Sequence, residues 1–166
     1  MQSSALLTLA LYQPDIPQNA GTLLRTCACL GVAAALIEPA GFPTSDRHFR
    51  RAGMDYLDTV ALHRHASFAA FETWRGAEVP VRRLILLTTA GDRTCWDVDY
   101  RPGDILMVGR ESAGVPAAVH AAADLRLTVP MRPPARSLNV AVAAGMVLGE
   151  ALRQLQRPVS RPGTLA

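Results

Sequence analysis

The sequence predicts an α/β domain in which a mostly parallel sheet carries helices on both faces. Short, continuous apolar runs alternate with helix-like segments, which is typical of parallel strands that are buried on both sides. The 166 residues fit one domain, and 49% of them are hydrophobic, enough for an ordinary core. We therefore expect a single domain over residues 1–156 and a flexible tail over 157–166.

The first half of the chain predicts three strands and three helices. An apolar run over 6–12 predicts a buried strand, and a helix is expected over 20–30, capped by Asn19 and stopped by Gly31. The other expected elements of this half are a strand over 32–38, a short polar helix over 46–52 capped by Ser45, a strand over 59–62 and a helix over 68–74.

The second half continues the alternation and ends in a long helix. We expect strands over 83–89, 104–108 and 125–129, and helices over 116–123 and 138–155. In the last helix, apolar residues recur at spacings of three and four, namely Leu138, Ala141, Gly145, Leu148, Leu152 and Leu155. Such a stripe, with small residues four apart, fits packing on the protein's own sheet or a subunit interface.

Charge and cysteine content limit the classes of function. The net charge is +3, and all 17 basic residues are arginines, which fits either phosphate binding or a compositional bias of the genome. Three cysteines without a CxxC pair disfavour a disulfide framework or a zinc site, and we expect no metal. The start lacks a basic region and no apolar run is long enough for a bilayer, so we expect a cytoplasmic protein without membrane contact.

Three polar loops follow predicted strand ends, over 14–21, 109–116 and 130–139. In an open α/β sheet, ligands bind beyond the carboxyl ends of the strands, so these loops are the expected site. The second loop offers Glu111 between two glycines but matches neither a dinucleotide-binding nor a Walker motif. In the third, Ser137 is expected to cap the last helix, whose free N–H groups suit an anion or a polar ligand edge.

Two arginine-bearing segments are candidates for RNA contact. Arg25 lies one helical turn after a glycine, with room for a phosphate or a ribose hydroxyl, although it also fits an ordinary surface arginine. The short polar helix offers three arginines and a nearby aromatic ring, which suit phosphates and stacked bases but also fit a solvated face. These residues are Arg47, Arg50, Arg51 and Tyr56.

The order of the motifs is more specific than any one of them. The chain reads PDIPQNAGTLLR over 14–25, GRESAGVP over 109–116, and VPM then RSLN within 129–139. It also contains IEPAGF (37–42), RRAGMDY (50–56) and LLTTAG (86–91). Over residues 6–156 this pattern resembles the SPOUT superfamily of RNA methyltransferases, and within it the tRNA (cytidine/uridine-34) 2′-O-methyltransferases.

The resemblance implies a fold, a cofactor and partners. It implies a C-terminal trefoil knot, a homodimer with the active site near the subunit boundary, and S-adenosylmethionine as methyl donor, leaving S-adenosylhomocysteine. The acceptor it implies is the wobble ribose in the anticodon stem-loop of tRNA. The residues it implies for the cofactor are Leu87, Gly109, Val129, Met131, Ser137 and Leu138.

The catalytic residues implied by the resemblance are Arg25, Asn19, Glu111 and Asn139. Positive charge on sulfur makes the methyl group reactive, so the protein must mainly orient the hydroxyl and help to remove its proton. We expect Arg25 to favour the alkoxide electrostatically, since the guanidinium pKa is too high for a base.

Three rival interpretations remain at this stage. The same chemistry can act on another tRNA position or on ribosomal RNA, and the fold can serve a non-catalytic RNA-binding factor. A nicotinamide-dependent reductase is the general α/β alternative, which the missing GxGxxG disfavours.

Overall fold

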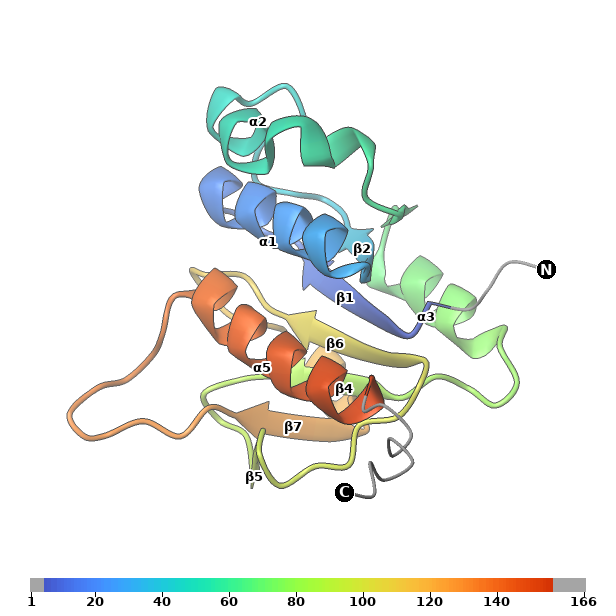
Figure 1. Ribbon diagram of the computed structural model, residues 1–166, viewed down its shortest axis with the longest axis vertical. Coiled ribbons are helices and arrows are strands. Elements are labelled where there is room, and N and C mark those ends of the chain that lie inside the picture. Colours follow the sequence, from blue (N-terminus) through green and yellow to red (C-terminus); the bar gives the residue numbers. More distant parts are fainter. Residues whose placement is uncertain (1–4, 157–166) are drawn as a thin grey trace, which may run out of the picture.

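The computed structural model describes residues 5–156 and shows the expected α/β architecture (Figure 1). Its seven-stranded sheet has the order β3-β2-β1-β6-β4-β7-β5, and all its strand pairs are parallel. The strands are β1 (Leu7–Tyr12), β2 (Ala33–Ile37), β3 (Leu62–His65), β4 (Leu84–Leu87), β5 (Arg93–Thr94), β6 (Asp104–Val108) and β7 (Leu125–Thr128). The helices are α1 (Pro17–Leu30), α2 (Arg47–Gly53), the 3-10 helix η1 (Met54–Asp58), α3 (Phe68–Gly76), α4 (Ala117–Ala122) and α5 (Val140–Leu155).

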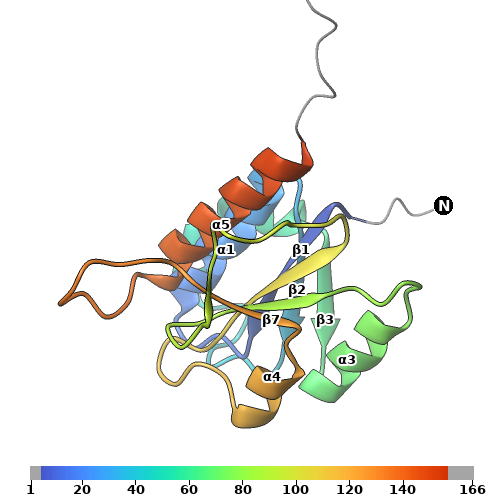
Figure 2. The same ribbon diagram turned by 90° about the horizontal axis from the view of Figure 1, so that it is seen from below.

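Helices cover both faces of the sheet, as the continuous apolar strands predict. Leu9 and Leu11 of β1 join the core beneath α1 and α5, whereas the alternate residues Ala10 and Tyr12 join the core beneath α3 and α4. Figure 2 shows the two helix layers on opposite sides of the strands. The trefoil knot stays a prediction of the resemblance, and the expected tail over 157–166 lies outside the described residues.

Three helix caps differ from the sequence-based expectation. The helix expected from residue 20 begins at Pro17 after Ile16, so Asn19 lies in its first turn and caps nothing. Asp46, not Ser45, caps α2 by accepting from the backbone N–H groups of His48 and Phe49. Ser137 does not cap α5 either, since that helix begins two residues later than expected. Several polar residues lie near each of these helix starts, so the sequence pattern alone cannot tell where the helix begins or which residue precedes it.

Gly31 ends α1 in the left-handed conformation, as predicted, with a φ of 66°. The strand expected over 59–62 lies instead at Leu62–His65. This strand is at the sheet edge and three of its four residues are polar, so it lacks the apolar run of an inner strand. The sequence analysis missed η1 and the two-residue β5, which are too short to give a periodic signal.

The buried face of α5 differs from the predicted stripe. Leu148 and Leu152 are buried as expected, but the other buried residues are Ala144, Val147 and Ala151. Gly145 and Gly149 face open space, since a methyl group added at either would touch nothing within 4 Å. Ala141 packs at the edge of the core, but the two glycines of the stripe leave open space beside them.

The crossing of α1 and α2 depends on Gly21. A Cβ atom there would lie 2.4 Å from the carbonyl oxygen of Phe49 and 2.9 Å from the amide nitrogen of Gly53. Without a side chain at this point, the two helices approach closely (Figure 1). The contact fixes the arginine-bearing helix α2 against α1, which carries Arg25.

Cys27 and Cys95 are buried and Cys29 is exposed, all three as free thiols. Burial raises the pKa of the Cys27 thiol to about 12, so this thiol is unreactive. Within residues 5–156 no helix is long and apolar enough to cross a membrane. No group of three or more His, Cys, Asp or Glu side chains in the same range is placed to hold a metal ion.

Candidate active site

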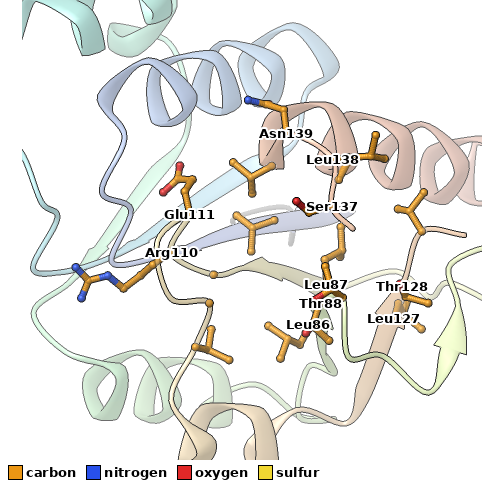
Figure 3. A pocket seen from close by; sticks show the side chains of 18 of the residues that line it. Leu86, Leu87, Thr88, Arg110, Glu111, Leu127, Thr128, Ser137, Leu138 and Asn139 are labelled. Carbon is orange, nitrogen blue, oxygen red and sulfur yellow. The ribbon is translucent and has the colours of Figure 1, made fainter. Parts of the chain in front are cut away.

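A cavity of about 550 Å³ lies beyond the carboxyl ends of β4, β6 and β7, beside the start of α5 (Figure 3). Its position follows from the parallel sheet, because the loops after these strands meet at one edge. All six residues that the sequence analysis assigned to the cofactor line it: Leu87, Gly109, Val129, Met131, Ser137 and Leu138. Three of the four predicted catalytic residues also line it: Asn19, Glu111 and Asn139.

The loop after β6 folds back on itself at the cavity wall. The backbone of Arg110 and Gly114 exchanges two hydrogen bonds, of 3.0 and 2.8 Å. Gly114 adopts a φ of 63°. A Cβ atom at Gly109 would lie 2.8 Å from the carbonyl carbon of Gly114. The two glycines therefore allow a compact turn that presents backbone to the cavity.

Asp15, in the loop after β1, holds three consecutive residues of this turn. Its carboxylate accepts from the backbone N–H of Glu111 at 3.1 Å and from the hydroxyl of Ser112, and it lies 3.7 Å from the Nε of Arg110. In return, the backbone N–H of Asp15 donates to the Glu111 carboxylate at 3.2 Å. Gly41 packs against the Cα of Asp15 and donates its N–H to the carbonyl of Pro14. The two loops therefore donate hydrogen bonds to each other in both directions, and Gly41 packs against the Asp15 loop.

The two carboxyl groups have opposite pKa shifts. The hydrogen bond to Glu111 is the main reason that the pKa of Asp15 falls to about 2. Burial raises the pKa of Glu111 above its ordinary value, and the adjacent Asp15 carboxyl raises it further. When the pair holds one proton, Glu111 carries it, and Asp15 remains ionised.

The start of α5 is joined to the start of α1 across the cavity. Asn139 caps α5 by accepting from the N–H groups of Ala141 at 2.9 Å and Val142 at 3.2 Å. Its amide Nδ2 donates to the Oδ1 of Asn19 at 3.0 Å. Asn19 is also close enough to Glu111 to lower the pKa of that carboxyl. One polar chain thus links Asp15, Glu111, Asn19 and Asn139.

The cavity suits S-adenosylmethionine in size and chemistry. Its volume falls within the usual range for small-molecule sites. Leu87, Leu127 and Val129 provide apolar walls for a flat ring, and the glycine turn provides backbone at close range. A carboxylate at one side suits a ligand that carries a positive charge.

Arg25 does not line this cavity in the single chain. Its Nη1 lies 3.1 Å from the sulfur of Met54, and its guanidinium carbon is 5.5 Å from the ring centre of Tyr56. Arg47, Arg50 and Arg51 on α2 are exposed, so the predicted RNA-contacting residues gather with Arg25 along α2 and η1. None of these five residues lines the cavity.

The sequence analysis missed Asp15, Thr88 and Thr128 as parts of the site. Both threonines line the cavity, at or just after strand ends. Asp15 lies within the motif PDIPQN and follows a strand, which was the available signal. Its partner is 96 residues away, and no local pattern predicts that contact.

Comparisons with known proteins show which proteins this chain is similar to. The model of the SpoU rRNA Methylase family matches residues 6–149. A tRNA (cytidine(34)-2′-O)-methyltransferase of Beijerinckia indica is 71% identical over 147 residues, which are 89% of this chain and 91% of that protein. A structure described as giving insights into the 2-OH methylation of C/U34 on tRNA is 44% identical, with a TM-score of 0.85, covering 93% of this chain and 99% of that one. The SpoU methyltransferase AviRb from Streptomyces viridochromogenes, solved with the cofactor AdoMet, is 27% identical, with a TM-score of 0.85, covering 97% of this chain and 61% of that one.

Proposed function

This chain belongs to the SpoU rRNA methylase family, and we propose that it methylates the ribose 2′-oxygen of nucleotide 34 of tRNA, a cytidine or uridine, using S-adenosylmethionine. The observation that carries the proposal is the coincidence of one cavity with all six predicted cofactor residues. The similarity to the tRNA (cytidine(34)-2′-O)-methyltransferase of Beijerinckia indica, which extends over nearly the whole of both chains, supports the choice of substrate.

The cofactor is held mainly by apolar contact and by backbone. Leu87, Val129 and Leu138 flank the space for the adenine and the ribose, and the backbone at Gly109 and Met131 offers polar edges. When bound, S-adenosylmethionine supplies a methyl group on a positively charged sulfur. Since that charge activates the methyl group, the remaining task of the chain is to orient the acceptor hydroxyl and to manage its proton.

The polar chain along the cavity is suited to this task. The amides of Asn19 and Asn139 are held together at 3.0 Å, beside the Glu111 carboxylate. They can bind a ribose hydroxyl in one orientation, because each is fixed by a helix start. Arg25 favours the alkoxide electrostatically and binds the neighbouring phosphate, rather than acting as a base.

Arg25 requires a second copy of the chain to reach such a site. It lies on the exposed side of α1, away from the cavity of its own chain. Beside α1, α5 exposes the apolar side chains of Val142 and Met146 together with the open faces of Gly145 and Gly149. A two-fold pairing through this face brings α1 against the partner, so that Arg25 completes the partner's cavity. The exposed arginines of α2 then lie beside the same cavity, where tRNA phosphates would bind.

Mixed dimers test both the activity and the shared site. Arg25→Ala and Gly109→Ala are each expected to lose transfer of labelled methyl to tRNA, the first with S-adenosylhomocysteine binding retained and the second with it weakened. When the two variants are mixed and allowed to exchange subunits, one of the two sites in a mixed dimer regains both residues, and transfer should reappear. Continued inactivity of dimers shown to be mixed contradicts the shared site. No transfer by the folded wild type to any tRNA contradicts the activity itself.

A further inference from the structure

Asp15 does not line the cavity, yet it contacts Glu111 and both of its neighbours in the loop, Arg110 and Ser112. Its carboxylate accepts from the Glu111 backbone and from the Ser112 hydroxyl and pairs with Arg110, and its own N–H donates to the Glu111 carboxylate. Asp15 bonds to both the backbone and the carboxylate of Glu111, and the side chain of Asn19 also acts on that carboxyl group. Asp15 therefore holds both the carboxylate of Glu111 and the loop that carries it.

We propose that Asp15 is a positioning residue of the methyl transfer, which holds Glu111 so that the Glu111 carboxylate accepts the proton of the ribose 2′-hydroxyl. This inference rests on the proposed function. In the step, the O2′–H bond breaks and its proton passes to a Glu111 oxygen. The O2′–CH₃ bond forms as the S–CH₃ bond breaks, and the electron pair of that bond stays on sulfur.

The surroundings of Glu111 suit a proton acceptor. It is half-buried, it faces the cavity, and it lies beside the amide of Asn19. A base works best when its pKa approaches the working pH, and both burial and Asp15 shift the pKa of Glu111 upwards. Asp15 itself keeps its charge, since the pKa of its carboxyl is about 2. The negative charge of Asp15 therefore remains beside Glu111 throughout catalysis and favours the protonated form of Glu111.

The contacts also explain why the pair is stable enough to act in this way. The Arg110 guanidinium forms an ion pair with Asp15 at 3.7 Å, and its charge offsets that of the pair. Figure 3 shows the Arg110 side chain at the edge of the cavity, directed away from the other labelled residues. Arg110 thus offsets the charge of the pair at the edge of the cavity, and Glu111 lines the cavity itself.

A double-mutant cycle tests the inference. Asp15→Asn keeps an oxygen that can accept from the Glu111 N–H but removes the charge. We expect it to slow single-turnover transfer by about 10- to 100-fold while S-adenosylhomocysteine affinity changes by less than about 3-fold, and Glu111→Gln to slow transfer by about 100-fold or more. The double variant should be no slower than Glu111→Gln, because Asp15 acts through Glu111. If the fold-loss of rate in the double variant equals the product of the two single fold-losses, the proposal is overturned.

Two pH measurements distinguish positioning from general loop support. In Asp15→Asn, the acid limb of the pH–rate profile should move to lower pH, since Glu111 loses the neighbour that raises its pKa. Carboxyl ¹³C NMR of Glu111, identified by its absence in Glu111→Gln, should show the same downward shift of the titration midpoint. An unchanged Glu111 midpoint would refute the proposal.

Controls keep the outcomes separate. Asp97→Asn removes an exposed carboxylate that accepts a hydrogen bond from the Thr94 hydroxyl. This control variant should change neither the titration midpoint of Glu111 nor the rate of single-turnover transfer. Asp15→Ser, whose hydroxyl can still accept from the Glu111 N–H, replaces Asp15→Asn if that variant does not fold. The NMR titration needs no catalysis, so a failure of methyl transfer in the wild type would refute the proposed function without deciding the Asp15–Glu111 coupling.

Discussion

Asn139 has two separable roles, and replacing it by alanine should affect both. The change removes the cap of α5, with its bonds of 2.9 and 3.2 Å, and the 3.0 Å bond to Asn19. Loss of an N-cap costs about 1 kcal/mol, and the bond between Asn139 and Asn19 is exposed to solvent, so it adds little to stability. We therefore expect the free energy of unfolding to fall by about 1 kcal/mol, or the melting temperature by about 2–4 °C.

Methyl transfer should suffer much more than stability in Asn139→Ala. The cavity loses a fixed amide and the anchor of Asn19, and misplacement by about 1 Å can reduce a rate by about 100-fold. Thermal unfolding at one fixed protein concentration and single-turnover transfer to tRNA measure the two effects separately.

Asn139→Ser is the matched control for this prediction. Serine caps a helix about as well as asparagine but is too short to reach the Oδ1 of Asn19. It should restore the melting temperature and leave transfer slow. Full recovery of transfer in Asn139→Ser would refute the role of the Asn19 contact, and an unchanged melting temperature in Asn139→Ala would refute the cap.

Three further predictions follow from single contacts. Gly109→Ala places a Cβ atom 2.8 Å from Gly114 and should weaken S-adenosylhomocysteine binding by about 10-fold or more in calorimetry, whereas Gly76→Ala, which adds a methyl group in open space, should not. Arg25→Ala should keep S-adenosylhomocysteine binding and lose turnover, and retained turnover would remove Arg25 from the mechanism. Glu111 has a raised folded-state pKa, so its contribution to stability is present below the ordinary glutamate pKa and is lost as pH rises through the folded pKa. Glu111→Gln should therefore raise the melting temperature at about pH 7.5 but not at about pH 3.5, and an equal effect at both would contradict the cost of burying this carboxylate.

The sequence predicted the inner strands and the long helices well because their apolar patterns are strong. The run from Asp104 to Val108 gave both ends of β6, and Gly31 gave the end of α1. The edge strand over 62–65 was misplaced, because it pairs with a neighbour on one side only and its last three residues are the polar HRH. Helix starts were wrong where several capping residues are adjacent, as with Ser137 and Asn139.

For the site, sequence motifs succeeded where contacts are local and failed where they cross the fold. The residues of the three motifs converge on one cavity because parallel strands end at the same edge. The Asp15–Glu111 pairing and the exposed glycine face of α5 depend on tertiary placement, which periodicity does not encode. Arg25 was expected at the acceptor, but in the single chain it contacts Met54 and Tyr56.

The most direct test of the central claim uses anticodon stem-loops that lack one 2′-hydroxyl each. The protein is incubated with labelled S-adenosylmethionine and with stem-loops carrying a single 2′-deoxy nucleotide at position 33, 34 or 35. We predict that transfer disappears only when nucleotide 34 is deoxy and that it continues with the other two. Continued transfer to the stem-loop that is deoxy at 34, or loss of transfer only when another position is deoxy, would contradict the account.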